Sequence, residues 1–336
     1  MAAVSLTFRA VDEPQPGEAW RARFAELWPA YSGWYLRDGD AARPSYREAR
    51  VMLQRHMPEL VGAWERMVEL AGGGDLAARF LSMYDPPPLV PGCSQAVYAR
   101  AGAPVLVRNY DFDPLRFDAV VLATTLTGRR VLGTSDCMWG LLDGLNDAGL
   151  AVSLTFGGDR RAGRGFAIPI VVRYLLETCA SVPDAEAALA RLPVQAPYNL
   201  TLLDRAGRRQ TLFVGPGEAP HPARVVAATN HQASVSWTQY ARATRTVERQ
   251  RCLLALLDDP GVDEASFVGA FLRAPLRSVD YAGAFGTLYT AVLRPADGTV
   301  EYRWPSLTWR QALDDFDEGI RTVALAGVCE SASTAM

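Results

Sequence analysis

Hydrophobic positions in the first quarter of the chain recur at helical spacing. Between residues 44 and 72 they fall three and four residues apart, at Leu53, Met57, Leu60, Val61, Trp64, Met67 and Val68. This spacing puts them on one face of an amphipathic helix. Pro58 should kink or split that helix, and the glycine run 72–74 should end it. The pattern therefore predicts a mostly helical segment over residues 17–83.

From residue 92 the pattern changes to short apolar runs separated by turns. These runs predict strands near residues 94–98, 105–108, 120–126, 131–133, 150–156, 199–203, 210–214, 224–228, 287–294 and 299–304. Helical pairs interrupt them over residues 168–192 and 237–272. Hairpins alternating with helix pairs predict an α+β fold of stacked antiparallel sheets with helices outside. The hairpin that ends near residue 304 is the last regular structure that the pattern predicts.

The proline-rich segment 86–92 separates the two patterns. It can be neither a helix nor a central strand, since proline lacks the backbone donor that both need. It is either a linker between two domains or the junction of a helical pro-segment with a catalytic domain.

Composition limits the classes of partner. The chain has 336 residues, a formal net charge of -3 and no apolar run of membrane-spanning length, so we expect neither nucleic acid nor membrane as a partner. The N-terminus shows no secretory signal, and five cysteines are an odd number, which favours a reducing cytoplasm. All 34 basic residues are arginine, which excludes any mechanism that needs a lysine amine.

Metal and cofactor patterns are missing from the sequence. The three histidines, His56, His221 and His231, lack ligand-like spacing, and no two cysteines form a CxxC pair. The glycine-rich run 157–165 matches neither the dinucleotide nor the phosphate-loop pattern, although its arginines are candidates for binding an acidic substrate. Asp136, Asp143 and Asp147 fit neither a calcium loop nor a paired-carboxylate site. We therefore expect no cofactor and no metal, and chemistry from Cys, Arg, Asp and Asn.

Cys93 is the best candidate nucleophile. It lies where the proline-rich segment meets the first strand, directly after Gly92, which permits unusual backbone geometry. Arg108 and Asp111 lie at the end of the next predicted strand, and a hairpin would fold them back toward Cys93. A thiol with a pKa near 8.5 needs a base, and with few histidines one available base is the α-amine of Cys93 itself. That amine exists only if the Gly92–Cys93 bond is cut.

These residues carry a resemblance to a known family. Gly92-Cys93, the Arg108-x-x-Asp111 pair, the segment GLNDAGLAV at 144–152, Thr229-Asn230 followed by His231, and Thr244-Arg245 occur in that order. Together they resemble the cysteine N-terminal-nucleophile hydrolases. The branch they resemble is the penicillin (isopenicillin N) acyltransferase-like branch of the choloylglycine hydrolase superfamily. The choloylglycine branch has an asparagine where this chain has Thr155-Phe156, so bile-salt hydrolysis itself is not expected.

The resemblance implies a fold and a domain division. The expected fold is a four-layer αββα sandwich of two antiparallel sheets with outer helices. Residues 1–92 would be a helical pro-segment, and residues 93–336 the catalytic domain. The chain would cut itself between Gly92 and Cys93, and the pro-segment would stay bound as a second fragment because its apolar face must be buried.

The resemblance also implies roles for individual residues. Cys93 would be the nucleophile, Arg108 would stabilise its thiolate, and Asp111 would orient the α-ammonium. Asn230 would donate to the oxyanion, and Arg245 would organise the site or bind a substrate carboxylate. Four residues are candidates for substrate binding: Tyr110, Phe112, Thr155 and Phe156. The implied substrates are small-molecule acyl amides or acyl thioesters, the latter linked to coenzyme A or a carrier protein, with the acyl group passing to water or to an amine.

Two alternatives remain open from the sequence. The first is a papain-type cysteine peptidase, with Cys93 attacking and His231 or His221 as base, although the Cys-Gly-x-Cys-Trp signature is absent. The second is a catalytically inactive member that binds a ligand and needs no Cys93.

Overall fold

The computed structural model describes residues 4–100 and 102–325, with the chain continuous through the Gly92–Cys93 bond. The strands are β1 (Ser5–Asp12), β2 (Gly92–Tyr98), β3 (Val105–Phe112), β4 (Val120–Thr124), β5 (Val131–Asp136), β6 (Gly140–Asn146), β7 (Leu150–Phe156), β8 (Tyr198–Asp204), β9 (Arg209–Gly215), β10 (Glu218–Pro222), β11 (Ala227–Ala228), β12 (Gly286–Arg294), β13 (Thr299–Trp304), β14 (Leu307–Ala312) and β15 (Gly319–Ala324). The helices are α1 (Glu18–Tyr35), α2 (Tyr46–His56), α3 (Val61–Leu70), α4 (Asp75–Leu81), α5 (Ile168–Thr178), α6 (Val182–Leu189), α7 (Thr238–Ala243), α8 (Thr246–Asp258) and α9 (Glu264–Ala270).

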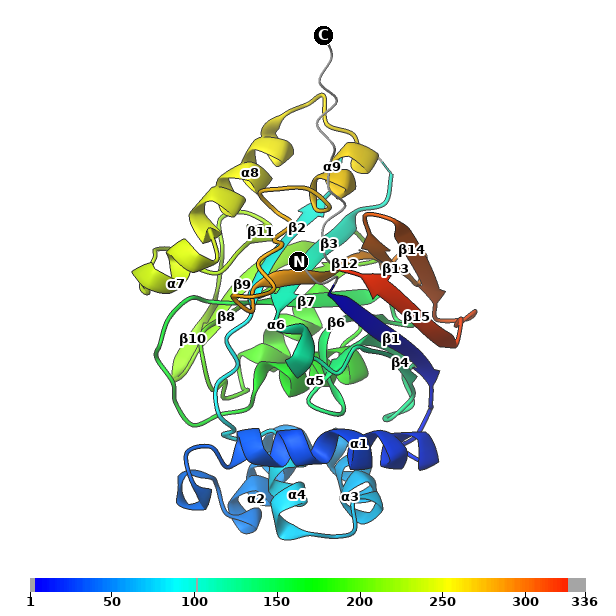
Figure 1. Cartoon of the computed structure of the whole chain (residues 1–336), viewed down its shortest axis with the longest axis vertical. Helices are drawn as coiled ribbons and strands as arrows, with labels where there is room; N and C mark the ends of the chain where they lie inside the picture. The colour runs from blue at the N-terminus through cyan, green and yellow to red at the C-terminus, as the bar shows by residue number, and fades with distance from the viewer. Residues whose placement is uncertain (1–3, 101, 326–336) are drawn as a thin grey trace.

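The strands form two stacked sheets. Within the described residues, one sheet has nine strands in the order β10-β9-β8-β7-β6-β5-β4-β1-β15, and the other has six in the order β11-β2-β3-β12-β13-β14. Helix α5 packs on β6 and β7 of the larger sheet, and α8 packs on β2 and β11 of the smaller one. Helices thus cover the outer faces of both sheets, which confirms the predicted α+β sandwich (Figure 1).

The inner strands are buried on both faces, as a layered sandwich requires. Every residue of β2, β4, β5, β6, β7 and β8 is buried. On the outer face of the smaller sheet, Ala96 and Val107 form a separate apolar cluster with Leu253 of α8 and Phe267 of α9. This packing fixes α8 against β2, and α8 carries one side of the site described below.

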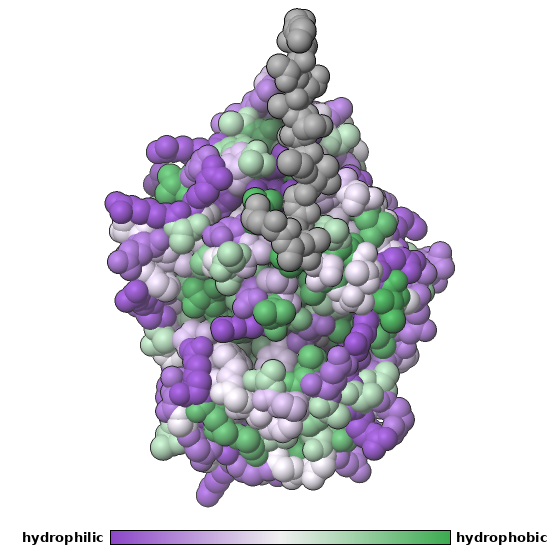
Figure 2. Space-filling view, viewed as in Figure 1, coloured by the Kyte–Doolittle hydropathy of each residue, from purple (hydrophilic) through white to green (hydrophobic). Residues whose placement is uncertain are grey.

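Residues 17–83 are helical as predicted, and Pro58 splits the helix. A 3₁₀ turn over Pro58–Leu60 separates α2 from α3. Figure 1 shows α1–α4 gathered at one end of the molecule, with α8 and α9 toward the other. On the face shown in Figure 2, hydrophobic residues lie in small groups between hydrophilic ones.

The description of residues 1–92 as purely helical is wrong in one respect. Strand β1 lies inside the larger sheet, pairing in parallel with β4 and antiparallel with β15. Its buried residues Phe8 and Ala10 alternate with the exposed Thr7 and Arg9, which is the two-residue period of a strand with one face on a core. Residues 5–12 therefore belong to the same sheet as strands that follow residue 92.

Two further features correct the strand predictions. Regular structure does not end at Trp304, because β14 and β15 follow it. Strand β6 was missed since its sequence, GLLDGLN, has no β-branched residue and contains two glycines. In the described part of the chain, no helix is both long enough and apolar enough to cross a membrane.

A pair of buried carboxyl groups joins α1 to the larger sheet. The hydroxyl of Tyr31 lies 2.6 Å from Oδ1 of Asp118 and 2.9 Å from Oδ1 of Asp136. One hydroxyl hydrogen cannot serve two carboxylates, so one carboxyl must itself carry a proton. Burial and the neighbouring Asp118 raise the pKa of Asp136 to about 8, while burial raises the pKa of Asp118 as well. The contact between α1 and the sheet therefore favours the state in which one of the two carboxyl groups is protonated.

We expect this pair to make the uncut chain less stable as the pH rises. The folded-state pKa of Asp136 lies above that of an unfolded aspartate, so the folded chain holds a proton that the unfolded chain has lost. Stability is then fully present below about pH 4 and falls toward about pH 8, by at most roughly 1.4 kcal/mol per pH unit. Thermal unfolding of the uncut Cys93→Ala chain across this range measures the slope. Asp136→Asn should flatten it, whereas the exposed control Asp315→Asn should not. Equal slopes in both variants would contradict the assignment.

Candidate active site

The β2–β3 hairpin brings the predicted catalytic residues together. Gly92 pairs with Asp111 and Cys93 with Tyr110, so Asp111 lies across the strand from the junction that precedes Cys93. Arg108 reaches the same region from the middle of β3. The hairpin predicted from the sequence therefore folds these residues back onto Cys93, as expected.

The Cys93 thiol is buried and contacts one guanidinium. Nη2 of Arg108 lies 3.5 Å from Sγ of Cys93, within hydrogen-bonding reach for sulfur. Burial raises the pKa of Cys93 to about 11, and Arg108 only partly offsets this. In the uncut chain the thiol is therefore protonated at neutral pH, and a nucleophilic role needs a group that takes its proton.

Arg108 is held by partners that the sequence did not suggest. Its Nε donates to the carbonyl of Leu154 at 2.9 Å, and its Nη1 donates to Asp143 at 2.5 Å. Asp143 also accepts hydrogen bonds from Thr134 at 2.7 Å and Tyr289 at 2.6 Å, and it is fully buried. The sequence spacing of Asp143 matched no known motif, but a carboxylate in an otherwise apolar strand was a signal of a buried ion pair.

Asp143→Asn should slow any reaction of Cys93 that depends on Arg108. Removing one partner of a buried ion pair typically costs about 3–5 kcal/mol of stability, and the guanidinium loses the carboxylate with which it pairs. We expect a lower melting temperature and a rate of cleavage at Gly92–Cys93 reduced by at least about tenfold. Mass spectrometry of timed samples measures that rate. Asp147→Asn, at an exposed ion pair just beyond β6, is the matched control. Unchanged cleavage in Asp143→Asn would show that Arg108 needs no fixed partner.

Asp111 lies in a second buried network on the other side of Cys93. Its Oδ1 accepts a hydrogen bond from Thr287 at 2.6 Å, and its Oδ2 accepts one from Arg249 at 2.6 Å. Burial raises the pKa of Asp111, against the effect of Arg249. The network also reaches Ser94, whose hydroxyl accepts from Arg249 at 3.1 Å.

Asn230 connects this network to the backbone of Cys93. Its Oδ1 accepts hydrogen bonds from Nη2 of Arg249 at 2.7 Å and from the backbone N–H of Cys93 at 2.8 Å. Its Nδ2 faces the carbonyl oxygens of Pro91 at 3.4 Å and Phe156 at 3.3 Å. Both ends of the Asn230 amide therefore contact the chain immediately around the Gly92–Cys93 bond.

The arginine predicted from the sequence is not in this network. Arg245 lies at the surface at the start of α8, with a left-handed backbone (φ 50°), and pairs with Glu248 at 2.6 Å. Arg249, one helical turn later, faces the sheet and is 2% exposed. An arginine on the buried face of a helix, one turn before the buried Leu253, is the signal that would have found it.

Thr155 supports the turn that carries Asn230. Its hydroxyl donates to the carbonyl of Thr229 at 2.8 Å. Asn199, opposite Thr155 on β8, donates to the same carbonyl at 2.8 Å and to that of His231 at 3.1 Å. The buried amide of Asn199 was not predicted, because no local pattern singles it out. Thr155 therefore has a structural contact here rather than an open face for substrate.

The aromatic candidates for substrate binding are largely buried in the uncut chain. Tyr110 is 2% exposed. The guanidinium carbon of Arg108 lies over the Tyr110 ring, 4.8 Å from the ring centroid. Phe156 packs edge-on against Tyr198 and Tyr240, and Phe112 is half-buried beside Tyr110.

The proline-rich segment is fixed along the catalytic part rather than acting as a loose linker. Tyr198 donates to the carbonyl of Leu89 at 3.1 Å, Tyr240 donates to that of Pro91, and Gln195 donates to that of Pro86. At Gly92, an added Cβ would lie 3.1 Å from Cβ of Asp111, so glycine permits the close approach of the two strands. The segment leads the chain to Cys93 in a defined path.

The geometry does not provide the pair that a papain-type peptidase needs. Nδ1 of His231 lies 2.9 Å from the hydroxyl of Thr246, and His221 lies on the exposed strand β10. Within residues 4–100 and 102–325, no hydrogen bond joins either ring to Cys93, and no three His, Cys, Asp or Glu side chains converge as a metal site.

Stacked sheets with a buried cysteine at the start of an inner strand, beside arginine, aspartate and asparagine, are consistent with an amidohydrolase or acyltransferase. The chain belongs to the acyl-coenzyme A:6-aminopenicillanic acid acyl-transferase family, whose model matches residues 99–309, more than half of the chain. The family resemblance predicted from the sequence is thereby confirmed, and the protein is an enzyme of this amide-hydrolysing or acyl-transferring class.

Solved structures with a related fold have low sequence identity. The C2A mutant of the conjugated bile acid hydrolase from Clostridium perfringens is 13% identical, with 69% of this chain and 96% of that chain covered and a TM-score of 0.46. Penicillin V acylase from Agrobacterium tumefaciens is 14% identical, with 70% and 92% covered and a TM-score of 0.47. The Caenorhabditis elegans N-acylethanolamine-hydrolyzing acid amidase ortholog is 16% identical, with 69% and 99% covered and a TM-score of 0.48. No curated protein sequence matches the chain.

Proposed function

We propose that this chain cuts itself between Gly92 and Cys93. The new N-terminal cysteine then hydrolyses linear amides or transfers their acyl group through an acyl-Cys93 intermediate. The observation that carries the proposal is the contact of Asn230 with the Cys93 backbone nitrogen, at 2.8 Å. The same amide oxygen is held by Arg249, which also pairs with Asp111. A buried charge network is thus directed at one particular peptide nitrogen.

Self-cleavage begins with the Cys93 thiol. Its sulfur bonds to the carbonyl carbon of Gly92, the carbon–nitrogen bond breaks, and the thiol proton ends on the Cys93 nitrogen. This leaves a thioester and a free α-amine, which water then converts to a Gly92 carboxyl group and a Cys93 thiol. Residues 1–92 and 93–336 become separate chains.

In the cleaved enzyme the α-amine is the base that the buried thiol lacked. Its ordinary pKa of about 7.7–8.0 lies close to working pH, and Asn230 and Asp111 are placed to orient it. The α-amine takes the thiol proton, and the thiolate adds to the acyl carbon of the substrate. The amine that leaves the substrate then takes this proton from the α-ammonium group. Arg108 stabilises the thiolate, and Nδ2 of Asn230 is the oxyanion donor once Pro91 has moved away from it.

The small fragment is proposed to remain bound after cleavage. Strand β1 is hydrogen-bonded on both sides within the larger sheet, and Tyr31 of α1 bridges Asp118 and Asp136 of the larger fragment. These contacts lie far along the chain from the cut bond and do not depend on it. The uncut chain is then a zymogen, and its pro-segment is a permanent subunit of the mature enzyme.

The proposed substrates are small-molecule acyl amides or acyl thioesters, including those linked to coenzyme A or a carrier protein.

The test begins with the intact mass of the purified protein under denaturing conditions. In proportion to 36.6 kDa for the whole chain, fragments of about 10 and about 26.6 kDa are expected, with Cys93 at the new N-terminus.

Incubation with an acyl-coenzyme A or an N-acyl amide tests the second stage. The larger fragment should gain the mass of one acyl group, and prior alkylation of Cys93 should prevent it. Added amine then separates transfer from hydrolysis by the product formed. A cleaved protein that never gains an acyl group from either donor class would contradict the proposed activity.

A further inference from the structure

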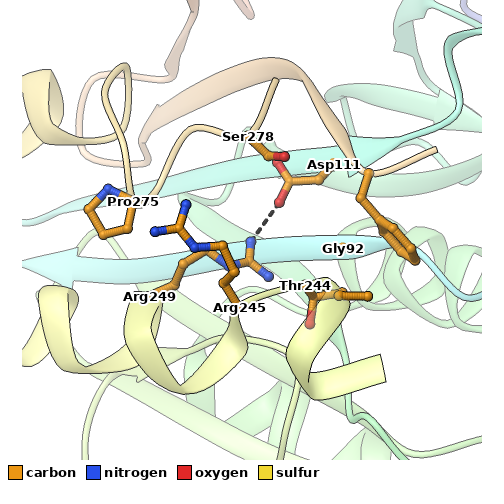
Figure 3. Close-up of a pocket in the computed structure, with 9 residues that line it drawn as sticks. Gly92, Asp111, Thr244, Arg245, Arg249, Pro275 and Ser278 are labelled. Atoms are coloured by element: carbon orange, nitrogen blue, oxygen red, sulfur yellow. Dashed lines mark hydrogen bonds and ion pairs between the residues drawn. The ribbon is translucent and has the colours of Figure 1, made fainter. Parts of the chain in front are cut away.

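A small cavity lies directly beside the bond that we propose is cut. It has about 30 Å³ of space, and its walls include Gly92, Asp111, Thr244, Arg249, Ser278 and Phe285. Figure 3 shows Asp111 on β3 and Arg249 on α8 reaching toward each other at this cavity. About 10–15 Å³ is enough to hold one water molecule. The cavity therefore has room for one or two.

Arg249, on the cavity wall, is held by three partners. Its terminal nitrogens donate to Asp111, Ser94 and Asn230. These contacts fix the Asp111 carboxylate beside the cavity. The carboxylate of Asp111 has lone pairs beyond those used by Thr287 and Arg249 and can accept a further hydrogen bond. A carboxylate acceptor, fixed by a buried guanidinium, thus lines a space of water size.

We propose that this cavity holds the water molecule that completes self-cleavage, with Asp111 as its base. The inference rests on the proposed self-cleavage and adds the site and the proton acceptor of its second step. In that step the water oxygen bonds to the Gly92 acyl carbon, and the bond from this carbon to Sγ of Cys93 breaks. The water proton passes to Asp111 and from there to the departing thiolate. Gly92 leaves with a carboxyl group, and Cys93 regains its thiol.

Filling the cavity mouth tests the site. Ala243 lines the cavity at the exposed end of α7, so a larger side chain there can cover the opening without entering the core. Ala243→Phe should slow the appearance of the two fragments by about tenfold or more, measured by mass spectrometry of timed samples. Arg242→Phe is the matched control, since that neighbouring exposed position does not line the cavity. It should cleave at the wild-type rate.

Enlarging the cavity gives a readout that a change in folding would not produce. Phe285 lies 3.3 Å from the position of a Cβ at Gly92, so Phe285→Ala opens space next to the acyl carbon. With hydroxylamine in the buffer, the pro-segment of Phe285→Ala should carry a hydroxamate at Gly92 several times more often than that of the wild type. The wild type, whose cavity fits water, should carry mainly a carboxylate.

The outcomes separate this inference from the proposed function. If the wild-type chain stays uncut, the proposed self-cleavage itself fails. The water site is wrong if the wild type cleaves, Ala243→Phe cleaves at the same rate and Phe285→Ala shows no gain in hydroxamate. Slow cleavage in the first variant or increased hydroxamate in the second supports it.

Discussion

Cys93→Ala is expected to leave a single uncut chain of 36.6 kDa, whereas the wild type gives two fragments. The alanine side chain has no nucleophile to add to the Gly92 carbonyl, and the effect should therefore be complete rather than partial. The side chain is fully buried, and removing one sulfur leaves only a small space. Denaturing mass spectrometry of both proteins, purified in parallel, measures the difference.

Cys137→Ala is the matched control for this change. Cys137 is also buried, but it lies directly after β5, and among the described residues no hydrogen bond joins it to Gly92 or Arg108. It should give two fragments, like the wild type. A wild-type chain that remains whole under the same conditions would remove the α-amine from the mechanism, and the proposed self-cleavage would be wrong.

Arg249→Lys is expected to reduce the rate of cleavage by about ten- to a hundredfold. Lysine keeps the charge, but its ammonium cannot reach Asp111, Ser94 and Asn230 at once as the planar guanidinium does. The loss of one or two charge-assisted hydrogen bonds corresponds to about 1.5–3 kcal/mol. Asn230 then loses the partner that fixes its oxygen on the Cys93 nitrogen. Timed mass spectrometry and the melting temperature of the uncut chain should be measured together.

Two other arginines make this prediction specific. Arg251→Lys, at an exposed position on the same helix, should cleave like the wild type. Arg245→Ala should slow cleavage less than Arg249→Lys does, because Arg245, although it lines the cavity, pairs with Glu248 rather than with Asp111. A larger effect at Arg245 than at Arg249 would restore the role that the sequence pattern gave to Arg245.

Residues close to Cys93 in sequence were the easiest to predict. Cys93, Arg108 and Asp111 come from one hairpin, so a strand period of two and a turn were enough to place them together. Asn230 was found only through the family resemblance, since a late turn has no local pattern that directs it to β2. The structure brings all four together, and the roles given to them stay predictions.

The long-range contacts of several site residues could not be predicted from the sequence. Asp143 meets Arg108 across the two sheets, and Asn199 meets Thr155 through strand pairing. Neither contact follows from spacing along the chain, because it depends on how the layers stack. Arg249 was missed for a different reason: the family resemblance directed attention to Arg245, one helical turn earlier. Strand β1 was not predicted because residues 1–92 otherwise show mainly helix and proline signals.

Because β1 lies in the proposed small fragment, cleavage would change the number of chains that must fold together. Before cleavage, β1 finds its place between β4 and β15 as part of one chain, so folding does not depend on protein concentration. After cleavage, the same sheet is assembled from two molecules, and its stability follows mass action. The melting temperature of the cleaved enzyme should therefore rise with protein concentration, whereas that of the uncut Cys93→Ala chain should not. The proposed cleavage of one buried bond would thus turn a unimolecular folding reaction into a bimolecular one, which dilute solution makes hard to repeat after unfolding.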